Sequence, residues 1–545
     1  MRNFTEIVEA RRTLPQILAV RADEIGDKPY VQFAQNPEES MTYAALFTEA
    51  ENAGTRLRTE HKLAMGDIIA ILLPNGRDFI RAWYASLFAG LVDVTINFDF
   101  KKATLRYGLS TVSAKAIFTD ESGLERLLDT EVCDYLVHHM VSVIISGTVS
   151  SETVSRLRKI APGLAITTLQ ELIEPVRPRR YWADVDASSL ASIRYTSGTT
   201  GPAKGIMYSH LFMLNRTAIH NDVFTLGGTD VLYSPFPLYH ALSGVMATVG
   251  TLIEGATMVS SKRFSASNFW CEIRRHDATL AHILYPLIPM LLKQPHEPTD
   301  RDHKVRYLYT AWPHEEFEKR FATQLIQVFA QSEVGVIAYR RGGTENHGRN
   351  VGQPLADVEV AIVDEMDRFL PTGEVGEIVV RPKVQNRIML GYYNNFTATA
   401  RAFRNLWHHT GDQGLIDEKG ELSFLGRLGD TIRRRGMNIS SEQIDEEIAR
   451  HPNVLECAVI GVPAEVGEED IHACIVWRNT QADETRGVAE LFAFMRERLP
   501  RPYIPRFVEI CEVLPRTNTG KFRKSELKSR IQFGRIWDEN LGQWT

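Results

Sequence analysis

Short apolar runs alternate with helix-like patterns along the first part of the chain. Residues 67–73 (DIIAILL) are typical of a buried strand, which ends at the turn residues Pro-Asn-Gly at 74–76. Residues 79–89 show helical spacing, and residues 92–97 form the next strand-like run. A strand, a helix and a second strand at this spacing predict a parallel sheet in an α/β fold.

The same alternation of strand-like and helix-like segments returns further along the chain. The pattern then changes towards the C-terminus. Residues 279–284 and 305–310 are two more strand-like runs. Beyond these, short strands such as 358–363 and 377–380 are divided by Gly and Asp turns, which predicts a smaller β-rich unit. A further boundary lies at the segment GRLGD, residues 426–430, and the residues after it are numerous enough for an independent α+β domain.

The charge balance argues against nucleic acid as a partner. Among 545 residues, Lys and Arg total 62 and Asp and Glu total 68, which gives a net charge of −6. Such a chain has no general attraction to nucleic acid or to anionic lipid. The most apolar stretch, residues 243–260, contains Ser, Thr, Gly and Glu and is too polar for a membrane span.

Cysteine usage and the N-terminal residues predict a cytoplasmic protein. The five cysteines, at 133, 271, 457, 474 and 511, include no Cys-x-x-Cys pair. This argues against zinc ribbons and disulfide frameworks and fits a reducing compartment. Charged residues interrupt the apolar ones throughout MRNFTEIVEARRTL, so we expect no signal peptide.

The most informative stretch is YTSGTTGPAKG, residues 195–205, which lies between a strand-like run and a helix-like one. Gly198 and Gly201 allow backbone amides to approach a ligand closely, and Lys204 supplies a charge suited to phosphate. Hydroxyl donors come from Ser197, Thr199 and Thr200. The segment is not a Walker loop, because Ala-Lys-Gly stands where that loop needs Gly-Lys-Ser/Thr. Composition alone leaves two interpretations open, a phosphate cradle and a flexible linker.

This string resembles the signature of the adenylate-forming superfamily, which includes acyl-CoA synthetases, adenylation domains and luciferases. Further motifs resemble those of the same family and follow in its order. They are PLYHA at 237–241, GEVGE at 373–377, GYYN at 391–394, WHHTGD at 407–412, GRLGD at 426–430, GMNI at 436–439 and LPRTNTGK at 514–521. The resemblance covers residues 42–528, and the run 308–313 is similar to the carnitine/crotonobetaine–CoA ligase group.

The resemblance implies an α/β fold with a large N-terminal domain over residues 1–429. This domain would contain two α/β sheet subdomains and a β subdomain, followed by a small, mobile α+β domain over residues 430–545. The mobility has a physical reason, because Lys521 and Gly436 belong to the same small domain but serve different steps. One orientation of that domain can present only one of them to the reacting centre.

The family activates a carboxylic acid with ATP to give an acyl-adenylate and pyrophosphate, and in its CoA-ligase branch CoA then displaces AMP. By resemblance, Lys521 is the catalytic cation that neutralises charge on the phosphate during the first step. Glu333 would hold Mg²⁺, a hard cation that prefers carboxylate and phosphate oxygens. Ser332 would reach the α-phosphate.

The remaining nucleotide contacts follow from the same resemblance. Asp412 would accept hydrogen bonds from the ribose hydroxyls, and Arg427 would support the same nucleotide. The phosphate loop would contribute Thr196, Ser197, Gly198, Thr199, Thr200, Gly201 and Lys204. The adenine wall would consist of Ala311, Trp312 and Phe329.

Two further groups of residues would serve the acid and CoA. The predicted acyl-pocket residues are His240, Ser243, Ala330 and Gln331. We assign no acid–base chemistry to His240. Asp430 is the predicted hinge, and Gly436 would let the pantetheine arm of CoA lie against the backbone. Arg433 either meets the phosphates of CoA or belongs to a solvated run of arginines.

The adenine and acyl walls depart from the family pattern. Trp312 is a large side chain where small ones are common, Phe329 lacks the usual tyrosine hydroxyl, and Ala330 replaces a glycine. The simplest interpretation is a complete acyl-CoA ligase with a reshaped pocket. The alternative is an enzyme that only transfers a preformed acyl-adenylate to CoA and depends on a separate adenylating partner enzyme.

Other functions share part of this pattern. A stand-alone adenylation enzyme that serves a carrier protein would have the same motifs, although nothing after residue 528 resembles a carrier domain. A luciferase-type oxygenase would need an aromatic luciferin pocket. A non-catalytic binding protein would not need Lys521. The acid itself stays open between fatty, aryl, terpenoid and betaine-type acids, and a homodimer is one open oligomeric state.

Overall fold

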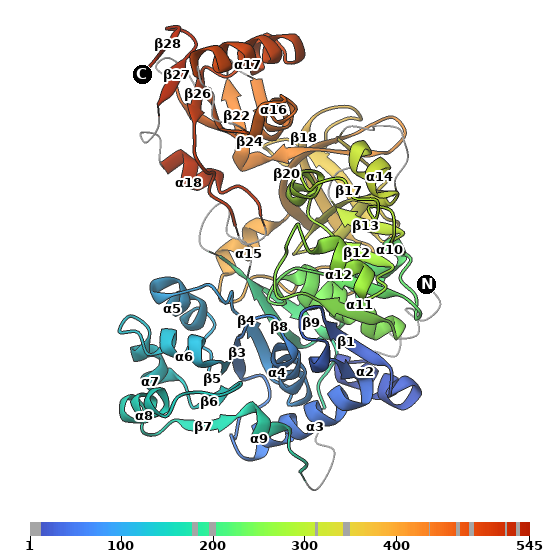
Figure 1. The fold of residues 1–545 in the computed structure, drawn as a ribbon, viewed down its shortest axis with the longest axis vertical. Coiled ribbons are helices and arrows are strands. Elements are labelled where there is room, and N and C mark those ends of the chain that lie inside the picture. Colours follow the sequence, from blue (N-terminus) through green and yellow to red (C-terminus); the bar gives the residue numbers. More distant parts are fainter. Residues whose placement is uncertain are drawn as a thin grey trace. The chain divides into compact units, whose positions relative to one another are not determined.

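The structure is a computed structural model that describes residues 12–176, 184–195, 203–310, 314–341, 349–434, 437–464, 469–478, 484–517, 520–529 and 535–545 (Figure 1). The chain forms two compact units. The first comprises residues up to 196, 203–346 and 382–400, and the second comprises residues 197–202, 347–381 and 401–545.

The first unit contains a seven-stranded sheet that includes the phosphate-loop strand. In spatial order its strands are β7 (Ala165–Thr168), β6 (Ser142–Ile145), β5 (Ala116–Thr119), β3 (Ile68–Leu72), β4 (Val92–Thr95), β8 (Leu190–Tyr195) and β9 (Gly205–Ser209). All neighbours pair in parallel except β8 and β9, which are antiparallel. The phosphate loop therefore connects the two strands at this edge of the sheet.

An eight-stranded sheet forms the other half of the first unit. Its order is β15 (Gly335–Arg341), β14 (Gln324–Gln331), β13 (Tyr307–Thr310), β12 (Leu280–His282), β10 (Val231–Ser234), β11 (Thr257–Ser260), β1 (Pro29–Phe33) and β2 (Met41–Thr42). Its central pairs are parallel, and the pairs at both edges are antiparallel.

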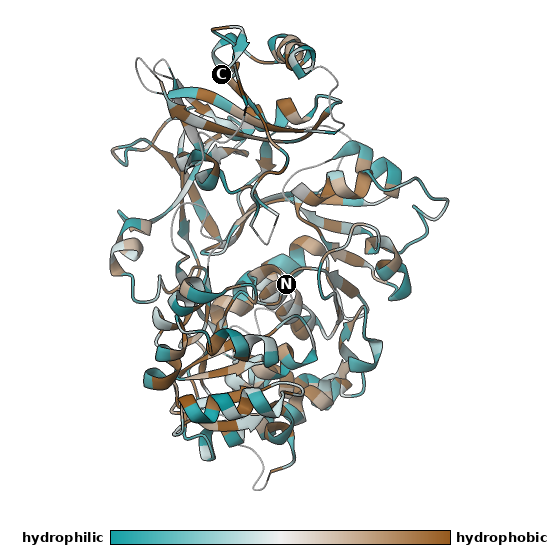
Figure 2. Ribbon diagram, turned by 60° about the vertical axis from the view of Figure 1, so that its left-hand side comes forward, coloured by the Kyte–Doolittle hydropathy of each residue, from teal (hydrophilic) through white to brown (hydrophobic). Residues whose placement is uncertain are grey.

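Helices connect and cover these strands. They are α2 (Leu14–Ile25), α3 (Tyr43–Thr59), α4 (Arg77–Phe88), α5 (Lys102–Ser110), α6 (Glu121–Leu127), α7 (Cys133–His139), α8 (Ser151–Ile160), α9 (Leu169–Ile173), α10 (His210–Phe224), α11 (Thr248–Glu254), α12 (Phe269–Arg275), α13 (Ile288–Leu292) and α14 (Glu315–Phe321). A π-helix, Leu242–Ala247, runs directly into α11. Figure 2 shows hydrophobic residues concentrated on the strands, whereas the helices contain both hydrophobic and hydrophilic residues.

The second unit contains three sheets. The six-stranded sheet consists of β16 (Asn350–Gly352), β21 (Leu422–Arg427), β20 (Trp407–Ile416), β18 (Gly376–Pro382) and β17 (Val358–Val363), with β19 (Phe403–Arg404) paired to β20. Strands β22 (Thr431–Arg434) and β23 (Met437–Ser440) form a hairpin. The five-stranded sheet runs β24 (Val454–Pro463), β25 (Glu469–Trp477), β26 (Phe507–Ile510), β27 (Ile536–Asp538) and β28 (Gln543–Trp544). The helices are α16 (Ser441–Ala449), α17 (Glu484–Arg498) and α18 (Lys524–Ser529), whereas most of α15 (Phe396–Ala402) belongs to the first unit.

The α/β fold class predicted from the sequence is confirmed. The run 67–73 contains β3, whose five residues are all buried, as expected for a parallel strand covered on both faces. The helical pattern at 79–89 corresponds to α4, and the run 92–97 contains β4, which pairs with β3 in parallel. The domain boundary at residue 430 stays a prediction and lies inside the second unit. Among the described residues, no helix is both long and apolar enough to cross a membrane.

A buried ion pair joins two strands of the seven-stranded sheet. Asp93 on β4 lies 3.4 Å from Arg194 on β8, and both side chains are almost completely buried. The Asp93 carboxylate also accepts hydrogen bonds from Ser192 Oγ (2.9 Å) and Trp83 Nε1 (3.0 Å). Burial raises the pKa of Asp93 to about 6, although the positive charge of Arg194 opposes the shift. The carboxylate therefore depends on the arginine to stay ionised inside the protein.

The change Arg194→Ala is expected to lower the free energy of unfolding by about 3–5 kcal/mol, because it leaves a buried carboxylate without its cation. Urea unfolding of the first unit, followed by tryptophan fluorescence, measures the effect. The matched control is Arg106→Ala, since Arg106 forms an exposed ion pair with Asp134 at 3.2 Å, and we expect a loss below about 1 kcal/mol. Equal losses in the two variants would contradict the structural role of the buried pair.

Candidate active site

The turn between β14 and β15 carries two of the predicted site residues. Ser332 and Glu333 are half-buried and lie in the turn that joins these antiparallel strands. A β-bulge lies between Phe329 and Ala330, so that Phe329 is buried whereas Ala330 is exposed. Gly335, which ends the turn, has φ of +84°, a conformation that favours glycine. Bulges and tight turns of this kind re-aim side chains near functional sites.

Buried donors hold the carbonyl groups of this turn. The carbonyl of Ser332 accepts hydrogen bonds from Tyr208 Oη (2.7 Å) and from Arg216 Nη1 on α10 (2.8 Å). Arg387, which is fully buried, donates to the carbonyls of Val334 and Val336. A guanidinium group is well suited to this task because it offers several donors in one rigid plane. These contacts fix the backbone on both sides of Glu333.

Glu333, Tyr392 and Lys204 come together in the first unit. Tyr392 Oη donates a hydrogen bond of 2.8 Å to Glu333 Oε1. The ammonium group of Lys204 lies 4.9 Å from the centre of the Tyr392 ring, within the range of a cation–π contact. The structure thus places the lysine of the phosphate loop and the predicted magnesium ligand around one tyrosine.

Backbone pairing between two distant segments produces this arrangement. Met207 N donates to the carbonyl of Gly391 (2.9 Å), and Tyr393 N donates to the carbonyl of Gly205 (2.8 Å). In addition, Met389 N donates to the carbonyl of Glu333 (2.9 Å). The GYYN motif therefore fastens the end of the phosphate loop to the turn that carries Glu333.

The loop that carries His240 is held from two sides. Asn75 donates to the carbonyl of Phe236 (2.9 Å) and accepts a hydrogen bond from Leu238 N (2.7 Å). Arg194 Nη1 lies 3.4 Å from the carbonyl of Leu238. Next to this loop, a Cβ atom on Gly244 would lie 1.8 Å from the same carbonyl, so no other residue fits there. His240 itself is half-buried, and its Nδ1 accepts a hydrogen bond from Leu242 N at 3.4 Å.

A buried polar chain begins at Ser243 in the π-helix. Ser243 Oγ lies 2.5 Å from Ser234 Oγ, and Ser234 Oγ lies 3.0 Å from His282 Nδ1. His282 Nε2 lies 2.9 Å from His220 Nε2. All four side chains are completely buried. Ser243 therefore faces this interior chain, and Gln331 is also buried, while Ala330 is exposed.

In the second unit, Asp412 and Arg427 lie opposite each other on β20 and β21. Arg427 Nε lies 2.9 Å from Asp412 Oδ1. Asp412 is buried, whereas Arg427 is partly exposed. Thr410 Oγ1 accepts a hydrogen bond from Asp412 N (3.0 Å), which helps to orient the residue. The predicted ribose-binding pair is thus formed by adjacent strands.

Lys521 also belongs to the second unit and is exposed. Thr517 N donates to the carbonyl of Lys521 (2.7 Å), and Lys521 N donates to Thr517 Oγ1 (3.1 Å). Behind this loop, the buried Lys524 pairs with Asp445 on α16 at 2.6 Å. The loop is therefore anchored from within while Lys521 faces solvent.

Several predicted residues lie outside the described parts of the chain. They are Thr196, Ser197, Gly198, Thr199, Thr200, Gly201, Ala311, Trp312 and Gly436. The backbone of Arg433 lies in β22, and Asp430 ends a short 3₁₀ helix, Leu428–Asp430, directly before it. The assignments of these residues to ligand binding stay predictions.

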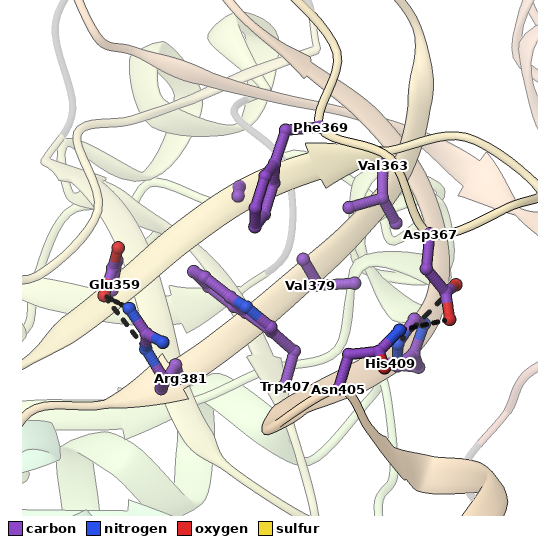
Figure 3. A pocket seen from close by; sticks show the side chains of 10 residues that line it. Glu359, Val363, Asp367, Phe369, Val379, Arg381, Asn405, Trp407 and His409 are labelled. Atoms are coloured by element: carbon purple, nitrogen blue, oxygen red, sulfur yellow. Dashed lines mark hydrogen bonds and ion pairs between the residues drawn. The ribbon is translucent and has the colours of Figure 1, made fainter.

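A separate pocket of about 570 Å³ lies on the second unit (Figure 3). Its walls include Phe369 and Trp407, together with the ion pair between Arg381 and Glu359 (2.6 Å). The sequence-predicted site residues are not among those that line it. The pocket thus adds a surface depression to the second unit and no part of the predicted adenylate site.

Comparison with known proteins decides the family. The model of the AMP-binding enzyme family matches residues 18–393, and that of the AMP-binding enzyme C-terminal domain matches residues 443–521. The chain belongs to the AMP-binding enzyme family. The predicted membership of the adenylate-forming superfamily, in its acyl-CoA ligase branch, is therefore confirmed.

Relatives of this AMP-binding enzyme are acid–CoA ligases. The chain is 30% identical over 526 residues to a sulfoacetate–CoA ligase of Cupriavidus necator, with 94% of this chain and 97% of the relative covered. It is 28% identical over 517 residues to a crotonobetaine/carnitine–CoA ligase of Citrobacter koseri, with 93% and 97% covered. These matches confirm the similarity to the carnitine/crotonobetaine–CoA ligase group.

Solved structures share the fold of this AMP-binding enzyme. An anthranilate CoA ligase in complex with anthranoyl-AMP superimposes with a TM-score of 0.83 at 21% identity, covering 95% of this chain and 97% of the other. An o-succinylbenzoate CoA synthetase of Bacillus subtilis, in complex with ATP and a magnesium ion, gives a TM-score of 0.76 at 22% identity, covering 94% and 99%.

Sequence reasoning missed the residues that support the site of this AMP-binding enzyme. Arg216, Arg387 and Asn75 act through long-range contacts with backbone carbonyls, and His220 and His282 meet only after folding. A sequence signal for Tyr392 exists in the GYYN motif at 391–394, although the motif alone gives no role for its tyrosine. A single arginine or asparagine in a helix or turn carries no comparable signal.

The buried histidine pair predicts a loss of stability in acid. Burial lowers the pKa of His220 to about 4 and that of His282 well below 6.5. At a pH below its ordinary pKa of 6.5, each histidine takes up a proton in the unfolded chain but not in the folded one. The free energy of unfolding therefore falls as the pH drops. For His220 alone the loss amounts to about 2 kcal/mol between about pH 8 and about pH 5.

We therefore expect His220→Gln to flatten the pH dependence of the unfolding midpoint of the first unit over this interval. Denaturant titrations of the wild-type protein and of His220→Gln at each pH measure the slope of the unfolding midpoint against pH. A loss of stability that is the same at every pH does not change this slope. The exposed His138, which lies 3.2 Å from Asp134, offers a control in His138→Gln, which keeps the buried pair and therefore its contribution to the slope. Parallel pH profiles for wild type and His220→Gln would contradict the prediction.

Proposed function

We propose that this AMP-binding enzyme is a complete ATP-dependent acyl-CoA ligase. It would join a carboxylic acid to ATP as an acyl-adenylate with release of pyrophosphate, and then transfer the acyl group to CoA with release of AMP. The observation that carries this proposal is the group formed by Glu333, Tyr392 and Lys204, because it provides the charges that the phosphates of ATP require.

The phosphate end of the site combines a carboxylate with a lysine. Glu333 offers hard oxygen donors that fit Mg²⁺. When bound, this ion would neutralise negative charge on the phosphates. Tyr392 orients the carboxylate through its hydrogen bond to Oε1, which leaves the carboxylate in one rotamer. Lys204 adds a positive charge on the phosphate side, and Ser332 adds a hydroxyl group for the α-phosphate.

The second unit would supply the ribose contacts and the catalytic cation. Asp412 would accept hydrogen bonds from the two ribose hydroxyl groups. Its contacts with Arg427 and Thr410 fix its position. Lys521 would stabilise the charge that develops on the α-phosphate when the carboxylate attacks it. An exposed ammonium group on an internally anchored loop is suited to this role, because the loop can deliver it without itself unfolding.

The hinge at Asp430 would allow the C-terminal domain to serve both steps. In one orientation it would present Lys521 to the acid and the α-phosphate. In the other, Gly436 would line the path of the pantetheine arm, with Arg433 near the phosphates of CoA. The order of the motifs on one small domain favours this alternation over a single fixed arrangement.

The acid is the least determined part of the proposal. The relatives named above act on sulfoacetate and on crotonobetaine or carnitine, which are small charged acids. Phe329 and Ala330 stand where the family usually has a Tyr-Gly pair, so the acyl pocket would have a different wall here. A test panel should therefore include these acids together with aryl and fatty acids.

This altered wall also supports a second candidate function. With Trp312, Phe329 and Ala330 in the adenine and acyl walls, the adenylation step would be lost while transfer of a supplied acyl-adenylate to CoA would remain. Such an enzyme would need a separate adenylating partner. The retained Glu333, Lys204 and Lys521 favour the complete ligase, because transfer to CoA alone does not require a cation at the pyrophosphate.

A paired assay separates the two functions. One arm receives the acid, ATP, Mg²⁺ and CoA, and the other receives the synthetic acyl-adenylate and CoA, with acyl-CoA measured by mass spectrometry. We expect product in both arms for at least one acid. Product in the second arm alone would contradict the complete ligase and establish the transfer enzyme.

Lys521→Ala provides the matched variant for this assay. Because Lys521 acts on the first step, the variant should lose about 10²–10³-fold or more in the first arm and change little in the second. Arg523→Ala, two residues further along the same exposed loop, should leave both arms unchanged. Equal loss in both arms for Lys521→Ala would contradict its assigned role.

A further inference from the structure

One face of the five-stranded sheet gathers metal-binding side chains that the ligase reaction does not use. His472 and Cys474 are two residues apart on β25, so their side chains point to the same face. Cys474 lies opposite Glu509 on the parallel strand β26, and Cys511 follows two residues later. We call His472, Cys474 and Glu509 the thiol–carboxylate cluster.

The members of this cluster converge on one carboxylate oxygen. His472 Nε2 lies 3.1 Å from Glu509 Oε2, and Cys474 Sγ lies 3.6 Å from the same oxygen. The three ligand atoms are all within 4.8 Å of one another. His472 and Cys474 are almost completely buried, and the Glu509 side chain is 15% exposed.

These separations match a tetrahedral zinc centre. Zinc binds nitrogen and carboxylate oxygen at about 2.0–2.2 Å and thiolate sulfur at about 2.3 Å, so a tetrahedral angle places N and O about 3.4 Å apart and S and O about 3.6 Å apart. The observed distances from Glu509 are 3.1 Å to nitrogen and 3.6 Å to sulfur. We propose that His472, Cys474 and Glu509 bind Zn²⁺.

The ligand types select zinc over the magnesium of the ligase reaction. A thiolate and an imidazole are soft and borderline ligands, whereas Mg²⁺ takes oxygen ligands in an octahedron. Zn²⁺ binds the thiolate form of Cys474, so binding releases the thiol proton to solvent and affinity rises with pH.

The position of the cluster gives the metal a structural role next to the catalytic loop. Cys474 and Cys511 pack in the same apolar cluster as Leu514, Phe522 and Leu527, which flank Lys521 on both sides. A metal ion at this place would tie β25 and β26 together beneath the segment that carries the catalytic lysine. The site would thus stabilise the C-terminal part of the chain without touching the substrates.

Cobalt substitution tests the proposal on the full chain. The protein, freed of any affinity tag, reduced and stripped of metal, is titrated with Co²⁺. We expect a thiolate-to-cobalt charge-transfer band that saturates at one ion per chain and disappears when Zn²⁺ is added. Absence of this band in the wild-type protein would overturn the proposal.

Matched variants locate the site and guard against unfolding. Cys474→Ala should abolish the band, and Glu509→Gln should weaken Co²⁺ binding by at least about tenfold. Cys457→Ala is the control, because Cys457 packs on the opposite face of the same sheet and should leave binding unchanged. At the same Zn²⁺ concentration, the melting temperature should also rise more for the wild-type protein than for Glu509→Gln. A full band in Cys474→Ala, or an equal Zn²⁺-dependent shift in Glu509→Gln, would contradict the assignment.

Discussion

Buried guanidinium groups hold the turn that carries Ser332 and Glu333, and the phosphate end of the proposed site depends on them. Arg216 donates to the carbonyl of Ser332, and Arg387 donates to the carbonyls on the other side of Glu333. The backbone of the turn is thereby fixed before any ligand arrives, so the carboxylate needs no rearrangement to meet a cation. Such preorganisation is the main way in which a protein stabilises developing charge.

The same turn links motifs that are far apart in the sequence. Tyr392 reaches Glu333 from the GYYN segment, which in turn pairs with the strand that follows the phosphate loop. The first unit thus brings together the predicted phosphate-binding residues Glu333 and Lys204, while the second unit contains Asp412, Arg427 and Lys521. This division agrees with a reaction in which one part of the chain binds the phosphates and another delivers the catalytic cation.

The sequence predicts the elements whose signals are local. The buried strand β3 and the helix α4 follow from an apolar run and from helical spacing, whereas the pairing of Asp412 with Arg427 is visible only in the folded sheet. The resemblance to the adenylate-forming superfamily adds the order of the domains and the roles of Glu333 and Lys521.

Other features depend on contacts between residues that the sequence does not bring together. Arg194 gives no local sign that it would be buried against Asp93, since an arginine in a strand is more often exposed. His220 and His282 are 62 positions apart and form a pair only because α10 packs against β12. The orientation of Ser243 likewise depends on the π-helix, which brings its hydroxyl group to Ser234 and into the interior.

The most direct test of the complete ligase is Mg²⁺-dependent exchange of labelled pyrophosphate into ATP in the presence of each acid. This exchange reports adenylation alone, because it does not require CoA or the second orientation of the C-terminal domain. Exchange that depends on one acid, and that Glu333→Gln removes, is the predicted result. The contradictory result is no exchange with an acid whose synthetic adenylate the enzyme readily converts to acyl-CoA.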